Sequence, residues 1–475
     1  MKILFISTEA DPFAKSGGLG DVAGSLPKQL NKRRADTRVM MPLYKSVKRR
    51  FSGAMTFLGN IVVDLAWRKQ YCGLFTLEED NVRYYFVDNE QYFGRDAFYG
   101  YYDDGERFAF FSKAVLDLLK IMDFKPDILH CNEWQTAMIP VYLKSAYRED
   151  QFYSQVKTVF TIHNVEYQGK FDRGIALDVL GIPAEDMHII DCDGGINLMK
   201  GAIVSCDRLT TVSPSYAEEL KDPYYAHGLD RFIRQYEHKF QGIINGIDND
   251  KFDPALDKII YANYSLKTID KKSVNKAALQ EQMGLKIDPA IPLIGMVGRM
   301  VAHKGMDIVR NGFPAIMAEN AQFAILGTGD EEYKHFFAHK AVEYKGQAAA
   351  SIHFSADLAN KIYAAADIFL MPSRSEPCGV AQMIALRYGT IPVVRETGGL
   401  KDSIAAFDPE TGAGNGITFL DYNEDELIKA VKRALSYYGD RKLWHKLVGN
   451  AMKSDFSWRK SATKYMDLYR SVIRS

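Results

Sequence analysis

Short runs that are apolar at nearly every position recur along this chain and constrain its fold more than any other feature. The first series consists of KILFIS, TRVMMP, VRYYFVD, DILHCN, TVFTIHN and RLTTVS. The second series follows residue 290 and consists of IPLIGMVG, AQFAILG, SIHFS, DIFLMPS and TIPVVRE. Strands that do not alternate between polar and apolar positions are typical of parallel sheets covered on both faces. Each series therefore predicts a parallel sheet.

Segments with helical periodicity lie between these runs, among them residues 106–122, 358–366 and 379–389. A repeated order of strand and helix predicts a doubly wound α/β domain. The segment GIINGIDNDKFDP separates the two series and is rich in Gly, Asn and Asp, which favour turns. We therefore predict an α/β fold of two Rossmann-like, doubly wound domains, hinged near residue 245.

The length of the chain agrees with this division, because 475 residues exceed what one hydrophobic core usually serves. We place an N-terminal Rossmann-like domain at 1–244 and a C-terminal one at 245–455. Residues 456–475 predict a C-terminal helix with Ser457 as its N-cap and an aromatic–aliphatic face. We expect this helix to cross back to the N-terminal domain.

The composition argues against several classes of partner. The 60 Lys and Arg residues balance the 60 Asp and Glu residues, whereas binding to nucleic acid requires a basic surplus. No stretch approaches the ~20 apolar residues of a membrane-spanning helix. The five cysteines are scattered without a C-x-x-C pair, which is unlike a zinc site or a disulfide framework. We expect a cytoplasmic protein with no membrane partner, and the composition leaves a homo-oligomer open.

The loop KSGGLGDVAG follows the first apolar run. Gly18 and Gly20 match a loose dinucleotide fingerprint, but a nicotinamide site needs an acidic residue at the end of the second strand. Here TRVMMP runs into Leu43 and Tyr44, which disfavours an NAD-dependent oxidoreductase. A glycine-rich turn at a helix N-terminus binds anions through its amides and the helix dipole, and Lys15 would add a charge. A tight strand–helix turn with a solvated Lys15 is the alternative.

Cationic or glycine-rich loops also follow several strands of the second series. Arg299 and Lys304 share one glycine-flanked loop, and a planar guanidinium beside a point charge suits a diphosphate. Glu376 opens a helix, where it could hold sugar hydroxyls or simply favour its own helix dipole. Other turns and helix entries contain Gly327, Gly329, Cys378, Gly379, Gly398 and Gly399. Together these loops predict a site for a nucleotide diphosphate and a hydroxyl-rich ligand.

These segments resemble those of one enzyme family along nearly the whole chain. The segments KSGGLGDVAGSLPKQL, YYDDGERFAFFSKA, DILHCNEWQTA, TVFTIHNVEYQGKF, GIINGID, GRMVAHKGMD, PSRSEPCGVAQM and YGTIPVVRETGGLKDS look like bacterial glycogen synthase and plant starch synthase. The combination of the KSGGL start with EPCG and ETGGLKD is highly specific for that family.

The resemblance implies a GT-B fold, which consists of two Rossmann-like domains around a deep cleft. It implies transfer of glucose from ADP-glucose to the non-reducing 4-hydroxyl of an α-1,4-glucan, with retention at the anomeric carbon. The partners would be a nucleotide-sugar donor and a glucan polymer acceptor. No metal and no cofactor would be required. The sequence leaves the choice between ADP-glucose and UDP-glucose open.

The resemblance also assigns site residues. The catalytic set would be Lys15, His163, Arg299, Lys304 and Glu376. The substrate-binding set would be Gly17, Gly18, Asp21, Glu133, Asn164, Gly327, Gly329, Cys378, Gly379, Thr397 and Gly398. In this family the first loop lies over the donor phosphates and glucose, and the two cations of the second half hold the diphosphate. We expect His163 to position the sugar through its backbone carbonyl rather than to transfer a proton.

The chain departs from the family pattern in a few positions. Glu133 stands where the family commonly has Asp, so its carboxylate is one methylene longer and its role in the cleft is open. Ser375 replaces a frequent Phe, and Val380 and Ala381 replace Leu and Thr. Ile384 occupies the position of a second Glu found in related retaining transferases, which fits the bacterial and plant synthases.

Two further functions remain as alternatives at this stage. One is a related GT-B transferase with another donor or acceptor, such as a sucrose or small-glycoside synthase. The other is an inactive glucan-binding homologue that scaffolds a partner. Intact Lys15, Arg299, Lys304 and Glu376 argue against the inactive homologue, because loss of activity usually removes such residues first.

Overall fold

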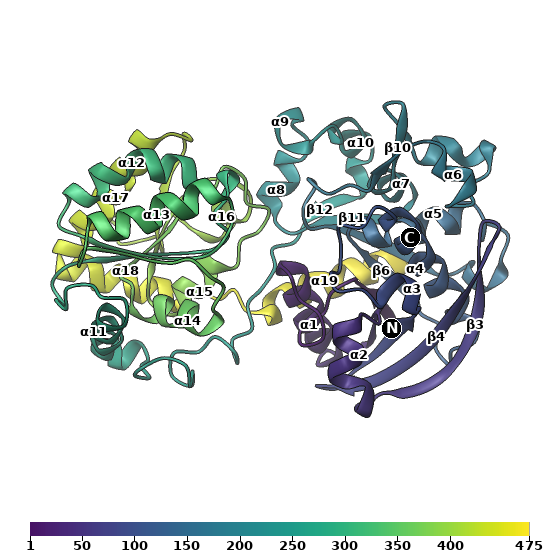
Figure 1. The fold of residues 1–475 in the computed structure, drawn as a ribbon, viewed down its shortest axis with the longest axis horizontal. Helices are drawn as coiled ribbons and strands as arrows, with labels where there is room; N and C mark the ends of the chain where they lie inside the picture. The colour runs from purple at the N-terminus through teal and green to yellow at the C-terminus, as the bar shows by residue number, and fades with distance from the viewer. Residues whose placement is uncertain (475) are drawn as a thin grey trace. The chain divides into compact units, whose positions relative to one another are not determined.

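The computed structural model describes residues 1–474, and the chain divides into two units (Figure 1). Unit 1 contains Met1–Ile244 together with the C-terminal segment that begins at Trp458, and unit 2 contains Asn245–Ser457. The boundary lies between Ile244 and Asn245, where the N-terminal domain drawn from the sequence also ends. The C-terminal segment forms helix α19 (Trp458–Arg474) and belongs to unit 1.

Unit 1 is built on a nine-stranded sheet with the order β12-β11-β7-β6-β1-β2-β5-β4-β3. The strands from β12 to β5 in this order are parallel, and the β5-β4-β3 end is antiparallel. The parallel strands are β1 (Lys2–Ile6), β2 (Asp36–Pro42), β5 (Val82–Asp88), β6 (Ile128–Asn132), β7 (Lys157–Ile162), β11 (Arg208–Thr211) and β12 (Phe240–Gly242). In register, Ile3 on β1 lies opposite Thr37 on β2 and Ile128 on β6.

The parallel strands confirm the prediction from the first apolar series, but the sequence analysis missed a long hairpin. Strands β3 (Thr56–Leu65) and β4 (Arg68–Glu79) extend the sheet as an antiparallel edge. The residues of β3 are largely exposed, so this strand lacks the continuous apolar run that marks a buried parallel strand. A small second sheet of β8 (Lys170–Phe171), β10 (Gly195–Asn197) and β9 (Asp191–Cys192) was also not predicted.

Helices cover the sheet of unit 1. The principal ones are α1 (Gly18–Asn31), α2 (Lys45–Phe51), α4 (Asp104–Leu119), α5 (Met138–Lys144), α7 (Leu198–Ser205), α8 (Pro214–Glu219) and α10 (Asp230–Gln235). The short helices are α3 (Glu90–Phe93), α6 (Ile175–Asp178) and α9 (Pro223–Ala226). Strands β1 and β6 are completely buried along their central residues, as the predicted two-sided cover requires.

Unit 2 is built on a six-stranded parallel sheet with the order β15-β14-β13-β16-β17-β18. The strands are β13 (Leu293–Val297), β14 (Gln322–Leu326), β15 (Ala348–Ser351), β16 (Ile368–Met371), β17 (Ile391–Arg395) and β18 (Ile417–Phe419). The helices are α11 (Lys272–Gln282), α12 (Met306–Ala318), α13 (Glu331–Glu343), α14 (Ala356–Ala365), α15 (Ala381–Arg387), α16 (Gly398–Ser403), α17 (Glu424–Gly439) and α18 (Arg441–Lys453).

Helices lie on both faces of this sheet, which confirms the doubly wound α/β class. Helices α12, α13 and α17 lie on one face and α11, α14 and α15 on the other (Figure 1). Two clusters of buried side chains pack against this sheet, one of which includes Val309 and Phe313 and the other Leu279 and Ile362. The first cluster is much the larger and forms the main core of unit 2.

Two local predictions are wrong. A strand was predicted at SIHFS, but β15 is formed by the preceding residues Ala348–Ser351 and the predicted run overlaps it only at Ser351. Phe354 at the end of that run is exposed, and the alanines of β15 are a weak strand signal. Ser457 precedes α19 as predicted, but its buried hydroxyl has no hydrogen-bond partner, so its side chain does not cap the helix. Instead its backbone amide donates to the Asp455 carboxylate at 3.0 Å.

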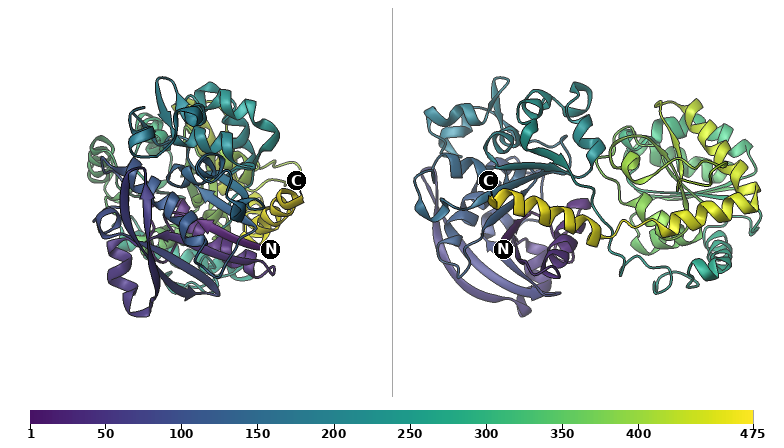
Figure 2. Two further views of the ribbon diagram at one scale, coloured as in Figure 1. Left: turned by 90° about the vertical axis from the view of Figure 1, so that its right-hand side faces the viewer. Right: turned by 180° about the vertical axis from the view of Figure 1, so that it is seen from behind.

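Helix α19 is fixed to unit 1 by hydrogen bonds that involve buried groups. It packs beside α1, which Figure 2 shows from behind. The His130 imidazole on β6 contacts the Tyr469 hydroxyl through Nδ1 at 2.6 Å and the Thr161 hydroxyl through Nε2 at 2.7 Å. Burial lowers the pKa of His130 to about 3, so the ring is neutral and both of its nitrogens are satisfied. The Ser461 hydroxyl donates to the Ile244 carbonyl at 2.7 Å.

Removing the Tyr469 hydroxyl tests this attachment. We expect Tyr469→Phe to lower the free energy of unfolding by about 1–3 kcal/mol, because Nδ1 of the buried His130 loses its partner. Urea unfolding followed by circular dichroism measures the change, with the exposed Tyr224→Phe as a matched control. A variant as stable as the unchanged protein would contradict the account of how α19 is held.

Candidate active site

The carboxyl ends of β1, β6 and β7 bring predicted site residues of unit 1 to one edge of the sheet. These three strands are neighbours, so the segments that follow them lie side by side. The loop after β1 leads to Lys15, Gly17 and Gly18 and into α1, which carries Asp21. Glu133 follows β6, and His163 and Asn164 follow β7.

Glu133 holds the segment that follows β7. Its Oε1 accepts hydrogen bonds from the backbone amides of His163 at 2.5 Å and Asn164 at 2.8 Å. Glu133 adopts a φ of +65°, which is uncommon for a residue other than glycine and is often found at functional sites. Burial raises the pKa of the Glu133 carboxyl to about 8, although the backbone hydrogen bonds oppose the shift. The longer side chain thus contacts backbone amides of the neighbouring loop.

His163 lies in this group as a neutral imidazole. Its Nε2 is 2.9 Å from Oδ1 of Asn132 on β6, which fixes the ring, and burial lowers its pKa to about 3. A base with so low a pKa is a poor acceptor for a proton at neutral pH. The environment of His163 therefore makes proton transfer unfavourable, and the expected contact between its carbonyl and the sugar stays a prediction.

The glycine-rich loop leaves open space at two of its glycines. A methyl group at Gly17 or Gly18 would have no heavy atom within 4 Å, so both residues border free volume at the start of α1. The Lys15 ammonium lies 2.5 Å from the Asp21 carboxylate, and both side chains are partly exposed. In this structure Lys15 is therefore paired with a protein carboxylate, and a ligand phosphate would have to compete for it.

Glu9 is a site residue that the sequence analysis missed. Its carboxylate is 3% exposed and accepts hydrogen bonds from the Ser16 amide at 2.5 Å, the Ser16 hydroxyl at 2.7 Å and the Gly17 amide at 3.3 Å. The Tyr99 hydroxyl donates to the same group at 2.9 Å. Glu9 therefore fixes the loop that carries Lys15. A carboxylate directly after a buried strand and ahead of a glycine-rich turn is the signal that could have identified it.

In unit 2, the loops after β13 and β16 contact each other through charged side chains. The Lys304 ammonium lies 2.6 Å from Glu376 Oε2, and the Ser373 hydroxyl donates to the same oxygen at 3.2 Å. Glu376 is almost fully buried, whereas Lys304 retains some exposure. The structure thus joins the predicted diphosphate lysine to the predicted sugar-binding carboxylate.

Arg299 lies in the same loop as Lys304, but its side chain is not paired with a carboxylate among the described residues. Its side chain is exposed, and no ion pair or hydrogen bond to it occurs within residues 1–474. A guanidinium with five free donors and no carboxylate to displace can bind an incoming anion at little electrostatic cost. Arg299 is therefore the cation of this edge that is available for an anionic ligand.

The glycines of unit 2 allow these loops to pack backbone against backbone. A methyl group at Gly327 would lie 1.9 Å from the Gly298 carbonyl oxygen, and one at Gly329 would lie 2.3 Å from that of Met300. Gly398 has a φ of +43°, and a methyl group there would lie 2.1 Å from the Glu376 carbonyl oxygen. Side chains at these positions would push the loops apart, so the glycines set the spacing of the site.

The remaining predicted residues of unit 2 lie in the same set of loops. Cys378 follows β16, and burial raises the pKa of its thiol to about 12, which leaves it unreactive as a nucleophile. Gly379 has a φ of +69°. Thr397 is buried between β17 and α16. The strands that deliver these loops, β14, β13, β16 and β17, are consecutive in the sheet.

Residues 1–474 show neither a metal-binding cluster nor a membrane-spanning helix. They contain no group of three or more His, Cys, Asp and Glu side chains arranged to hold a metal ion. None of their helices combines the length and the apolar character that crossing a bilayer demands.

Comparisons with known proteins decide the family. A family model described as the starch synthase catalytic domain matches residues 2–235, and one for glycosyl transferases group 1 matches residues 281–453. A glycogen synthase from Clostridium botulinum is 48% identical over 475 residues, which cover 99% of each chain. The chain belongs to the glycogen synthase and starch synthase family.

Further relatives extend this result. A glycogen synthase from Geobacillus thermodenitrificans is 46% identical and covers 100% of this chain and 98% of its own. The solved catalytic domain of starch synthase IV from Arabidopsis thaliana, bound to ADP and acarbose, matches with a TM-score of 0.90 and 32% identity over 100% of this chain and 99% of its own. As a member of the glycogen synthase and starch synthase family, the chain has the GT-B fold and is a hexosyltransferase.

A more distant structure shares the fold alone. Sucrose-phosphate synthase from Thermosynechococcus elongatus matches with a TM-score of 0.62 at 16% identity, over 100% of this chain and 99% of its own. This match is consistent with the GT-B assignment and carries no argument about substrates.

The raised pKa of Glu133 predicts a pH-dependent stability. An unfolded Glu ionises near pH 4.5, whereas buried Glu133 retains its proton up to about pH 8, so unfolding releases a proton between these values. Stability contributed by the protonated carboxyl is complete at low pH and is lost as pH rises through this window. We expect Glu133→Gln to remove a slope of about 1.4 kcal/mol per pH unit.

Urea unfolding at several pH values from 5 to 9 measures this slope for both proteins. Glu9 and His163 face Glu133, and the difference between the two proteins cancels their own titration to first order. Parallel stability curves for Glu133→Gln and the unchanged protein would show that Glu133 is ionised throughout.

Loosening the glycine-rich loop tests the role of Glu9. We expect Glu9→Gln to lower kcat/KM for glucosyl transfer by about tenfold to a hundredfold, because a displaced loop misplaces Lys15. The exposed and unpaired Glu149→Gln is the matched control. Full activity in Glu9→Gln would mean that the loop keeps its conformation without this carboxylate.

Proposed function

We propose that the chain elongates an α-1,4-glucan by transferring glucose from ADP-glucose to the non-reducing 4-hydroxyl of the polymer, with retention of the anomeric configuration. The observation that supports this most directly is the group of Arg299, Lys304 and Glu376 at one edge of the unit 2 sheet. This group offers cations for a diphosphate and a carboxylate for sugar hydroxyls. The Arabidopsis relative in complex with ADP and acarbose is consistent with such a pair of ligands.

Binding of the donor exchanges the partners of Lys304. In this structure the Lys304 ammonium is neutralised by Glu376 at 2.6 Å. A diphosphate carries more charge than one carboxylate and is held by Arg299 as well, so it draws Lys304 away from Glu376. The released Glu376 carboxylate then accepts hydrogen bonds from glucose hydroxyls. The Lys304–Glu376 pair therefore holds one group for the diphosphate and one for the glucose hydroxyls.

The chemical step breaks the bond between the anomeric carbon of glucose and the phosphate oxygen. The leaving group is a nucleoside diphosphate, whose developing negative charge is stabilised by fixed cations and amides. The acceptor 4-hydroxyl forms the new bond on the same face of the sugar, and its proton passes to the departing phosphate oxygen. Atoms and charges balance without a protein base, which agrees with the low pKa of His163.

Unit 1 carries candidate groups of its own. Lys15 and the amides at the start of α1 are the anion-binding groups of that unit, while Glu133 and Asn132 fix the backbone and ring of His163. We assign Lys15 to the donor phosphates and the His163 carbonyl to a sugar hydroxyl. A phosphate would displace Asp21 from Lys15 for the same reason as in unit 2, because it carries more charge than one carboxylate.

We further propose that the reaction needs no cofactor and no metal ion, because lysine, arginine and helix N-termini provide the positive charge. All five cysteines are free thiols, which is the state expected in the reducing cytoplasm where we place the enzyme. The EDTA-treated enzyme should therefore retain its activity.

Incorporation of label into polymer tests the proposed function. The protein is incubated with glycogen and either radiolabelled ADP-glucose or UDP-glucose, with and without EDTA, and the precipitated polymer is counted. We expect incorporation from ADP-glucose that survives EDTA. Incorporation from UDP-glucose alone would correct the donor, and no incorporation from either would favour an inactive glucan-binding homologue.

Removal of the two cations tests the proposed site. We expect Lys304→Ala and Arg299→Ala each to lower kcat by about a hundredfold to a thousandfold, comparable to the loss of a transition-state donor. Lys258→Ala removes an exposed, unpaired cation of the same unit and is the matched control. Near-normal turnover in both site variants would contradict the diphosphate assignment.

A further inference from the structure

Unit 2 contains a cavity at the edge of its sheet opposite to the proposed donor site. The cavity has a volume of about 570 Å³, which is within the range of small-ligand pockets. Its floor includes Pro289 and Asp367, which precede β13 and β16, and Gly389, which precedes β17. The loops of Arg299 and Glu376 follow the carboxyl ends of the same strands. The cavity is therefore separate from the proposed donor site.

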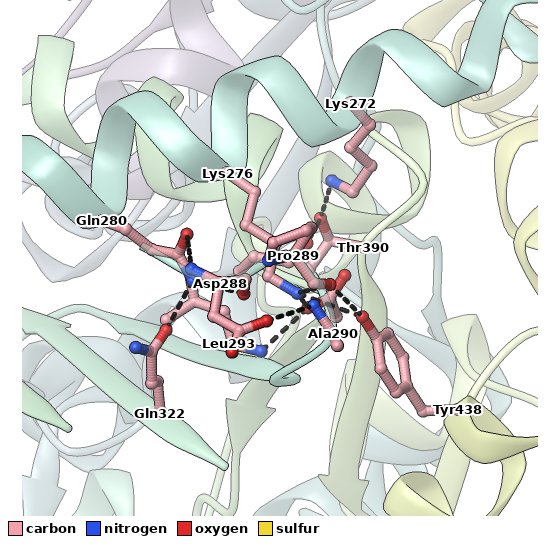
Figure 3. Close-up of polar contacts among 12 residues, drawn as sticks. Lys272, Lys276, Gln280, Asp288, Pro289, Ala290, Leu293, Gln322, Thr390 and Tyr438 are labelled. Atoms are coloured by element: carbon pink, nitrogen blue, oxygen red, sulfur yellow. Dashed lines mark hydrogen bonds and ion pairs between the residues drawn. The ribbon is translucent and has the colours of Figure 1, made fainter. Parts of the chain in front are cut away.

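The floor of the cavity is a closed network of polar contacts (Figure 3). The Lys276 ammonium lies 2.7 Å from the Asp367 carboxylate and 3.0 Å from the Tyr438 hydroxyl. The Lys272 ammonium donates to Thr390 Oγ1 at 2.7 Å and to three backbone carbonyls. Burial lowers the pKa of Lys272 to about 7. Both lysines therefore use their hydrogen-bonding capacity within the protein.

The walls combine aromatic rings with polar groups that remain available. Trp444 and Tyr438 pack edge to face with ring centroids 5.1 Å apart, and both rings line the cavity. Asp270 lines the cavity from the segment just before α11, and Arg441 lines it from the start of α18. Both side chains are exposed. Within residues 1–474 neither of these two side chains has a hydrogen-bond or ion-pair partner, and the same holds for the imidazole of His445.

We propose that this cavity is a second binding site for a segment of α-glucan, with glucose rings stacked on Trp444 and hydroxyls bound by Asp270, Arg441 and His445. The inference rests on the proposed function, since it assigns the polymer acceptor a contact away from the site of transfer. Aromatic rings together with carboxylate and guanidinium groups in one cavity match a sugar, which has apolar faces and a rim of hydroxyls.

The charge distribution favours a neutral sugar over an anion. Lys276 is neutralised by Asp367, and Lys272 is saturated by four acceptors. At the rim the charges of Arg441 and Asp270 cancel. The two lysines therefore offer a phosphate no free donor, and the unpaired Arg441 is offset by the carboxylate of Asp270 in the same lining, unlike at the edge where Arg299 is free. A second contact would keep the polymer close to the enzyme between transfers and raise its effective concentration.

Fluorine NMR of protein labelled with 5-fluorotryptophan observes this cavity directly. The chain contains four tryptophans, so each contributes one signal, and the Trp444 signal is the one lost in Trp444→Phe. Maltoheptaose, inorganic phosphate and ADP are added separately, without donor sugar. We expect maltoheptaose to shift the Trp444 signal saturably, and phosphate and ADP to leave it in place.

The control signal is that of Trp67, which is 72% exposed on unit 1 and should not move in parallel with Trp444. A Trp444 signal that is indifferent to maltoheptaose would overturn the proposal. So would a shift caused by phosphate or ADP instead, which would reveal an anion site. The NMR measurement needs no turnover, so its outcome does not depend on whether the radiolabelled donor is incorporated into polymer.

A kinetic measurement adds a second test. We expect Trp444→Ala to raise KM for glycogen by about threefold to tenfold, the loss expected for one aromatic contact. Trp67→Ala is the matched control. An unchanged KM for glycogen in Trp444→Ala would contradict the proposed role of the cavity, even if the unchanged enzyme is fully active.

Discussion

The ion pair between Lys304 and Glu376 connects the predicted phosphate chemistry of unit 2 to its predicted sugar chemistry. The ammonium and the carboxylate oxygen lie 2.6 Å apart, and they come from loops that follow two adjacent parallel strands. Glycine lets these two loops approach closely, because a methyl group at Gly305 beside Lys304 would lie 2.3 Å from the Pro372 carbonyl oxygen. This charge pair keeps both groups positioned but lets a diphosphate compete for the lysine.

Unit 1 also pairs a candidate phosphate-binding lysine with a carboxylate. Lys15 is paired with Asp21, and the loop that carries it is bound by the buried carboxylate of Glu9. Glu133 performs a comparable task for the loop of His163 through two backbone amides. In both units a carboxylate fixes a loop at the carboxyl edge of a parallel sheet, which limits the cost of ordering the loop when substrate binds.

Much of this could be predicted from the sequence because buried parallel strands and glycine-rich turns have local signals. Four strands of the unit 2 sheet, β13, β14, β16 and β17, followed from apolar runs, and Arg299, Lys304 and Glu376 lie in the turns after them. Strand β15 was misplaced and β18 was not predicted, because both are short and β15 is built of alanines. The β3–β4 hairpin was missed because it is an exposed edge without such a run. Glu9 was missed because its role depends on contacts with Ser16 and Tyr99, and Tyr99 is distant in sequence.

Calorimetric titration of ADP into Glu376→Gln tests the central claim most directly, because it asks whether Glu376 competes with the diphosphate for Lys304. The substitution preserves the size of the side chain and removes the charge that holds the ammonium. The account predicts that the Kd for ADP falls by about threefold to tenfold, in line with the worth of one partly exposed ion pair, while glucosyl transfer is impaired. A Kd for ADP that is unchanged or higher in Glu376→Gln would contradict it.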